Sequence, residues 1–173
     1  MKTIKILALV SFVTLFLTSC VSVRVSSDYD SKTNFNDYKT FAFYKKGIDK
    51  SKISDLDKKR ILRAIESELT AKGMTKSSNP DVLVSIFAKS EKRVDVYNNN
   101  YWYPSYYGPY WNNYSKYTEG TLLIDLIDNK GKTLLWQGVG KGVLSTSKKV
   151  EKREARIKEF VAEIMKVYPP ESK

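Results

Sequence analysis

The sequence predicts an α+β fold, in which an antiparallel sheet of about five strands has two helices packed on one face. Three observations support this prediction. Short stretches with strand character occur in consecutive runs, turn signals separate neighbouring strands, and two longer stretches carry apolar residues at helical spacing. Strands joined by hairpins and interrupted by helices are typical of α+β proteins. Residues 20–173 are long enough to form one domain with a hydrophobic core.

The first half of this domain is predicted to contain two strands and one helix. Residues 21–26 alternate valine with polar residues, which is the period of a half-buried strand, and the aromatic stretch 40–44 favours a second strand. Ser54, with Asp57 three residues later, has the pattern of a helix N-cap, and Gly73 is a suitable stop. The apolar stripe of this helix comprises Ile61, Leu62, Ile65 and Leu69.

The second half is predicted to contain three strands and a final helix. Residues 81–88 form a strongly apolar strand that the pattern extends toward Tyr97. Residues 120–127 and 133–143 flank an Asp-Asn-Lys-Gly turn and therefore predict a hairpin. The last helix is expected at about residues 147–167, before two prolines. Its apolar face comprises Ile157, Phe160, Val161 and Ile164.

Three glycines alternate along the strand at 133–143. Gly138, Gly140 and Gly142 match neither the GxGxxG pattern nor a Walker phosphate loop, and they do not lie at a strand-to-helix turn. Alternating glycines inside a strand indicate a bulge or the close approach of another backbone. We therefore predict a structural role for them.

The first twenty residues resemble the signal peptide and lipobox of bacterial lipoproteins. Two lysines precede an uncharged stretch of about twelve residues, which is shorter than a membrane span, and Leu-Thr-Ser then precedes Cys20, the only cysteine. The resemblance implies that residues 1–19 are removed as a signal peptide and that Cys20 becomes the acylated, membrane-anchored N-terminus. Because Val21 occupies the position at which aspartate signals inner-membrane retention in enterobacterial lipoproteins, the resemblance also implies an outer-membrane anchor facing the periplasm. The alternative is an ordinary secretory signal with a coincidental cysteine.

The composition argues against an enzyme. The chain has no histidine, so it lacks the commonest general base and metal ligand, and acylation of Cys20 would leave no free thiol. Asp125 and Asp128 are three residues apart on a predicted strand, where their side chains would point to opposite faces. We therefore expect no catalytic residues, no metal and no cofactor.

The net charge of +11 favours anionic partners, either lipid headgroups or acidic polysaccharide, although a solvated lysine surface has the same composition. No nucleic-acid motif is present.

The candidate binding site is an aromatic segment at residues 97–117. It has ten aromatic residues in 21 positions, no aliphatic side chain and one charge, and it is longer than an ordinary hairpin loop. It is predicted to be a platform for sugar rings, a contact with another protein or the membrane interface, or a low-complexity insert that covers the sheet. The candidate contact residues are Tyr101, Trp102, Tyr106, Tyr107, Tyr110 and Trp111.

Motifs across residues 20–173 resemble those of the DUF4136 family of bacterial lipoproteins. The motifs are Asp28-Tyr29-Asp30, Tyr38–Ala42, Asn79–Val84, Gly120–Leu126 and Leu135–Gly138, in the family's order. The family has no established activity, so the resemblance implies architecture and location and no catalytic residues. Within these motifs, Trp136 is expected in the core, and Asp125 is expected to cap or to pair locally.

These observations together predict a lipid-anchored envelope lipoprotein with a non-catalytic binding or structural role. Its expected partners are the membrane, through acylated Cys20, and an envelope protein or a glycan. The alternative function is a glycan-binding module in which the aromatic segment is the binding site.

Overall fold

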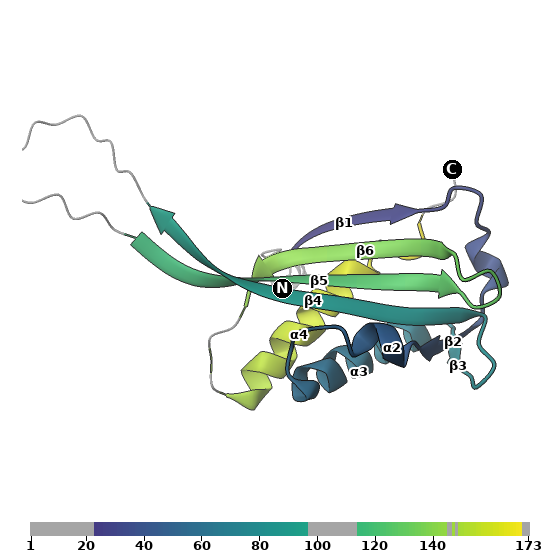
Figure 1. Ribbon diagram of the computed structural model, residues 1–173, viewed down its shortest axis with the longest axis horizontal. Helices are drawn as coiled ribbons and strands as arrows, with labels where there is room; N and C mark the ends of the chain where they lie inside the picture. The colour runs from purple at the N-terminus through teal and green to yellow at the C-terminus, as the bar shows by residue number, and fades with distance from the viewer. Residues whose placement is uncertain (1–22, 97–113, 145–146, 148, 171–173) are drawn as a thin grey trace, which may run out of the picture.

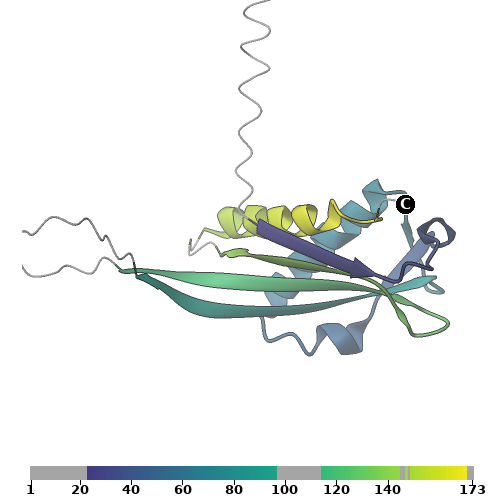
Figure 2. The same cartoon turned by 90° about the horizontal axis from the view of Figure 1, so that it is seen from above.

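The computed structural model describes residues 23–96, 114–144, 147 and 149–170. They form a six-stranded sheet with two long helices against one face (Figures 1 and 2). The predicted signal peptide, Cys20 and all six aromatic contact candidates lie outside the described residues.

The strand order across the sheet is β1-β6-β5-β4-β2-β3. Its antiparallel part consists of β1 (Val23–Tyr29), β6 (Leu134–Val143), β5 (Tyr114–Asp128) and β4 (Val82–Val96). At one edge, β2 (Thr40–Phe43) runs parallel to β4, and the short β3 (Thr75–Lys76) runs parallel to β2. The predicted hairpin at 120–143 is confirmed as β5 and β6.

The two long helices follow their predicted start and stop signals. In α3 (Asp55–Ala71), the Ser54 hydroxyl accepts a hydrogen bond from the Asp57 amide at 3.1 Å, which confirms the predicted N-cap. The helix ends before Gly73, whose φ of 85° is the left-handed conformation that glycine adopts without strain. The final helix, α4 (Val150–Met165), ends ahead of the two prolines. A 3₁₀ turn, η2 (Phe35–Asp37), follows β1.

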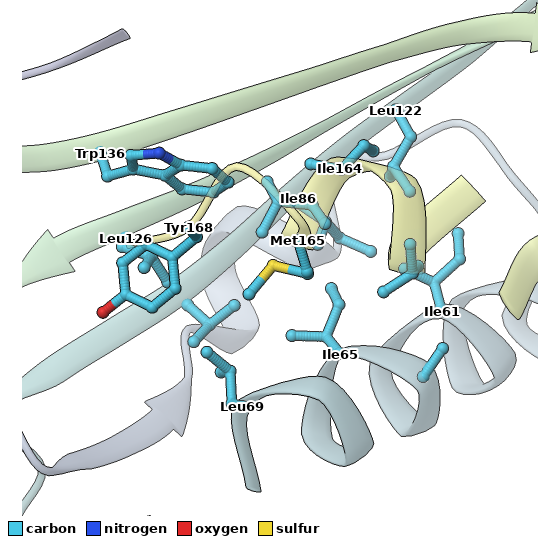
Figure 3. Packing of buried hydrophobic residues seen from close by; sticks show 14 of the residues in the cluster. Ile61, Ile65, Leu69, Ile86, Leu122, Leu126, Trp136, Ile164, Met165 and Tyr168 are labelled. Atoms are coloured by element: carbon cyan, nitrogen blue, oxygen red, sulfur yellow. The ribbon is translucent and has the colours of Figure 1, made fainter. Parts of the chain in front are cut away.

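The hydrophobic core fills the space between the sheet and α3 and α4 (Figure 3). Ile65 and Leu69 of α3 are fully buried, as are Ile164 of α4 and Trp136 of β6, so the predicted helix stripe and the predicted core tryptophan are confirmed. Full burial of such a side chain contributes about 1.5–3 kcal/mol. Trp136 packs edge-on against Tyr168 with ring centroids 5.2 Å apart, which closes the core beyond the end of α4.

The α+β class is confirmed, but the prediction of a purely antiparallel sheet with about five strands is wrong. The sheet has six strands, and β2 joins both of its neighbours in parallel. Parallel neighbours need a long crossover connection, and α3 lies in the connection between β2 and β4. A four-residue strand carries no signal for its direction, so its pairing depends on the path of the following helix.

A third, short helix lies between β2 and α3. The single turn α2 (Lys45–Ile48) lies at the β4 edge, where Gly47 packs against Ser85 on the sheet face opposite to α3 and α4. The amide of Tyr44 donates to the Val84 carbonyl at 2.8 Å, and the Ser51 hydroxyl donates to the Ile86 carbonyl at 2.9 Å. This segment therefore covers the part of the β4 edge that β2 leaves open.

The alternating glycines of β6 allow α4 to pack closely against the sheet. A Cβ atom built on Gly140 would lie 2.7 Å from Cδ1 of Ile164, and one on Gly138 would lie 2.5 Å from Cγ2 of the same residue. A close approach is present at Gly138 and Gly140, but the prediction that the neighbour is another backbone is wrong, because the nearest atoms belong to side chains. A bulge was the other prediction for these glycines. The register shift in the β5–β6 pair instead lies between Leu126 and Ile127 of β5.

Candidate functional site

A two-stranded arm projects from one end of the sheet (Figure 1). β4 and β5 pair continuously from Val82 opposite Asp128 to Val96 opposite Tyr114. Strand β6 accompanies β5 only as far as Val143, opposite Glu119. The arm therefore consists of residues 92–96 and 114–118, and it carries the segment 97–113 between its two strands.

Ion pairs fasten the root of the arm to the sheet. Glu119 accepts from Arg24 of β1 at 2.7 Å and pairs with Arg93 of β4 at 3.4 Å. Arg93 also pairs with Glu91 at 3.0 Å, and Lys89 pairs with the same carboxylate. The two arginines and Lys89 are at least half exposed, so each pair contributes little alone. Their shared partners link three strands at this position.

The connection between β4 and β5 is shorter than the predicted aromatic loop at 97–117. Residues 114–117 were assigned to a loop at 97–117, but they continue β5. Beyond the ion-paired root, Val94 on β4 is 55% exposed. The arm thus presents apolar as well as charged surface close to the segment that carries the predicted contact residues.

A pocket of about 570 Å³ lies beneath the root of the arm, between the sheet and the first turns of α3 and α4. Its volume falls within the range of about 300–1,000 Å³ that is typical of small-molecule sites. Its apolar wall is formed by Ile53, Ile61, Ala88, Leu122, Leu144, Ile157 and Phe160. This pocket could not be predicted from the sequence, because its lining comes from five separate parts of the chain.

The mouth of the pocket carries an ion-paired bridge between the two helices. Asp57 of α3 accepts from Arg153 of α4 at 2.6 Å and from Arg60 at 2.9 Å. The Asp57 side chain is only 15% exposed, so its charge is balanced mainly by these two arginines. Arg153 thus joins α4 to α3.

A second arginine of α4 closes the neighbouring part of the rim. The Arg156 guanidinium donates to the Val143 carbonyl at 2.9 and 2.6 Å and pairs with Glu159 at 2.7 Å. Its guanidinium carbon lies 4.7 Å from the centre of the Phe160 ring, within the range of a cation–π contact. Arg156 is thereby held between the end of β6 and the pocket wall.

The described chain begins at the same end of the sheet as the arm and the pocket. Val23 pairs with Gly142, Gly142 with Gly120, and Gly120 with Ser90, so these residues form one row across four strands. Gly120 and Ser90 also line the pocket. Cys20 is three residues before Val23, which places it within about 11 Å of this row even with the chain fully extended.

Asp125 makes the local pair that the sequence predicted. It lies opposite Gln137 in the β5–β6 ladder, and the Gln137 amide donates to its carboxylate at 2.7 Å. Burial raises the pKa of this carboxyl, and the hydrogen bond from Gln137 opposes that change in part. Asp125 lies on the sheet face opposite to the pocket, so it plays no part in that site.

Trp136 is the other motif residue with an informative environment. Its indole Nε1 is buried and has no hydrogen-bond partner within the described structure. The edge-on Tyr168 ring is its aromatic neighbour, and N–H groups make weak favourable contacts with aromatic faces. Both rings lie in the core, which indicates a packing role.

The described residues contain neither a candidate metal site nor a candidate membrane span. No group of three or more cysteine, aspartate or glutamate side chains lies close enough to hold a metal ion in this part of the chain. None of the helices described here combines the length and the apolar character needed to cross a bilayer.

Solved structures with a similar fold exist, at low sequence identity. A PDZ domain protein from Parabacteroides distasonis ATCC 8503 is similar with a TM-score of 0.50 and 21% identity. The match covers 88% of this chain and 37% of that one, so this chain spans little more than a third of that relative. The PelC dodecamer from Paraburkholderia phytofirmans is similar with a TM-score of 0.51 and 11% identity, over 83% of this chain and 94% of that one. At these identities the likeness shows the fold alone.

One family model matches this sequence. No match is found among curated proteins. The family model for a domain of unknown function, DUF4136, matches residues 25–170. This range contains every helix described above and all but the first two residues of the sheet. The chain therefore belongs to the DUF4136 family.

Proposed function

We propose that this protein is a lipid-anchored lipoprotein of the bacterial envelope that binds a partner and has no catalytic role. In this proposal Cys20 carries the membrane anchor, and the β4–β5 arm presents the aromatic segment to another envelope component. The observation that supports it most strongly is the arm itself, which extends past the other strands while carrying the aromatic segment.

The geometry of the arm and the anchor supports a partner close to the membrane. From the row of Ser90 to Val96 the arm covers six residues, or about 20 Å at strand spacing. The three residues from Val23 to Cys20 cover at most about 11 Å. Since both leave the same end of the sheet, an acylated Cys20 would keep the arm beside the membrane surface. Tyrosine and tryptophan favour such interfaces because their rings combine apolar faces with a polar group.

The test begins with the anchor. Cells expressing the full chain are labelled with an alkyne-bearing fatty acid, and the protein is recovered from the membrane fraction. We expect labelling of the native chain, and we expect Cys20→Ser to lose both the label and membrane retention. Equal labelling of the two proteins would refute the anchor. Met1 and the signal segment are kept in both forms, so export is matched.

The second part tests the arm. A photoreactive residue replaces Val94, which is 55% exposed, or Leu134 at the far end of the sheet, which is 49% exposed. We expect a discrete adduct from position 94 in intact cells, absent from position 134 and reduced by Cys20→Ser. The same adducts from both positions would contradict a partner at the arm.

The alternative function is a glycan-binding module with the same segment as its site. Residues 21–173 are titrated with muropeptides and a panel of polysaccharides, with tryptophan fluorescence as the readout. The control replaces Trp102 and Trp111 by alanine and keeps the buried Trp136 as an internal reporter. A saturable change that the double variant abolishes would establish the glycan function. A flat response in the folded protein would exclude those ligands.

A further inference from the structure

We propose that the pocket beneath the arm binds a single acyl chain that bears an anionic headgroup. The site is separate from the aromatic segment, and it is lined by residues of β4, β5, α3, α4 and the connections before α3 and after β6. Three features carry the proposal: an apolar wall, an excess of cations at the mouth, and the position of the mouth relative to Val23.

The apolar wall suits a hydrocarbon chain. Ala88 and Leu122 are floor residues on neighbouring positions of β4 and β5, and both are buried. Phe160 and Ile157 of α4 form one side, and Ile61 of α3 forms the other. Transfer of apolar surface from water to such a wall stabilises a bound chain by about 25 cal/mol for each Å² removed from solvent. The volume of about 570 Å³ is sufficient for a ligand and is not filled by the protein's own side chains.

The mouth of the pocket is positively charged. Lys52, Arg153 and Arg156 are the cations that line it on the helix side of the sheet, and Asp57 is the carboxylate among the lining residues. Arg153 already pairs with Asp57, and Arg156 pairs with Glu159. Lys52 is exposed and has no ion-pair partner among the described residues. Together with the Ser90 hydroxyl, it provides donors for a carboxylate or phosphate whose chain enters the apolar interior. The Ser54 hydroxyl is already engaged, since it donates to the Asp57 carboxylate at 2.8 Å.

The position of the pocket matches this ligand. Its lining residues Ser90 and Gly120 belong to the row that ends at Val23, where the chain enters the sheet. If Cys20 carries the anchor, the mouth opens beside lipid headgroups. The pocket does not depend on that anchor, because none of its lining residues precedes Lys52. Failure of acyl binding and failure of the anchor are therefore distinguishable.

Binding is tested with residues 21–173, which retain every contact described above. The probe is cis-parinaric acid, a fatty acid whose fluorescence rises in an apolar site. We expect a saturable increase with one site per chain. Palmitate and palmitoyl-lysophosphatidylglycerol then compete for the site and distinguish a free fatty acid from a phospholipid as the source. Hexadecanol has the same chain as palmitate without the charge, and it should compete about three- to tenfold less well.

Two pairs of matched variants locate the site. Lys52→Glu should weaken parinarate binding by about three- to tenfold, since it replaces a favourable charge with a repulsive one. Lys50→Glu, an equally exposed change two residues earlier in the same loop, should leave the affinity unchanged. Ser90→Phe places a ring in the mouth and should reduce affinity about tenfold or more. Ser26→Phe is the same change at an exposed position on the other sheet face and should have no effect.

Each of the following results would overturn the proposal or its assignment to this pocket. A folded protein that gives no saturable signal excludes acyl binding. Equal effects of Lys50→Glu and Lys52→Glu, or of Ser26→Phe and Ser90→Phe, would place the probe outside this pocket. Equal competition by hexadecanol and palmitate would refute the anionic headgroup. Thermal unfolding of each variant is measured first, and since Lys52 and Ser90 are both exposed, their substitution should leave the midpoint close to that of the parent.

Discussion

Replacement of Gly140 by alanine tests whether α4 is held against the sheet by the absence of a side chain. The added Cβ would lie 2.7 Å from Cδ1 and 2.8 Å from Cγ1 of Ile164, and 3.3 Å from Cγ1 of Val23. Favourable contacts between carbon atoms occur at about 3.5–4.0 Å. Ile164 is fully buried, so its side chain cannot move outward without displacing other core residues.

The magnitude follows from two opposing effects. Overpacking of this kind costs about 1–3 kcal/mol. Gly140 does not have a positive φ, so alanine fits the backbone and gains about 0.4–1 kcal/mol through the reduced entropy of the unfolded chain. We therefore expect a net loss of about 1–2 kcal/mol, which lowers Tm by about 2–8 °C in a domain of this size.

The assay is a double-mutant cycle measured by urea unfolding. Ile164→Ala removes the atoms that the new methyl group would meet, and it should itself cost about 2–5 kcal/mol. In that background Gly140→Ala should cost almost nothing. Gly138→Ala provides the contrast, because its Cβ would also meet the Trp136 ring, and that clash remains after Ile164 is shortened. An equal cost of Gly140→Ala in both backgrounds would refute the close-packing explanation.

Three further predictions concern the cap and two buried groups. Ser54→Ala should destabilise the protein by about 0.5–2 kcal/mol in urea unfolding, because the Asp57 amide loses its partner; no change would mean that the cap is not needed. Burial raises the pKa of Tyr168 to about 12, so the folded state keeps a proton that the unfolded state loses near pH 10. Stability should fall as the pH rises from about 10 to 12, and Tyr168→Phe should flatten this dependence in Tm measurements. Burial also raises the pKa of Asp125. The free energy of unfolding should therefore fall as the pH rises and the Asp125 carboxyl ionises. Asp125→Asn, which keeps an acceptor for Gln137, should be more stable than the parent at pH 7 and lose that advantage below the carboxyl pKa; a pH-independent difference would contradict this.

The helices and most strands could be predicted because their signals are local. The N-cap at Ser54, the stop at Gly73 and the stripe of Ile61, Ile65 and Leu69 each depend on residues within a few positions of one another. The free energy of a cap or of an amphipathic face is determined at that range. The same applies to the β5–β6 hairpin, whose turn residues join two apolar strands directly.

The two candidate sites also differ in whether local sequence predicts them. The aromatic segment was identified by composition alone, and its contact residues remain predictions. The pocket could not be predicted from the sequence, although the helix that contains Ile61, its cap Ser54 and the strand that contains Leu122 were all predicted. Asp57 had been read as a cap residue, and its partner Arg153 is 96 positions away. No local pattern indicates that such a pair closes the mouth of a cavity.

The sequence by itself determined the family, the α+β class, the ends of α3 and the buried face of each long helix, because periodicity and capping are encoded between near neighbours. Only the tertiary structure decided the parallel direction of β2, the projection of the arm beyond β6 and the pocket between the helices and the sheet. These features depend on which distant segments pair and how closely they approach. That choice is made by the packing of the whole core, in which Gly140 and Ile164 contact each other from separate elements.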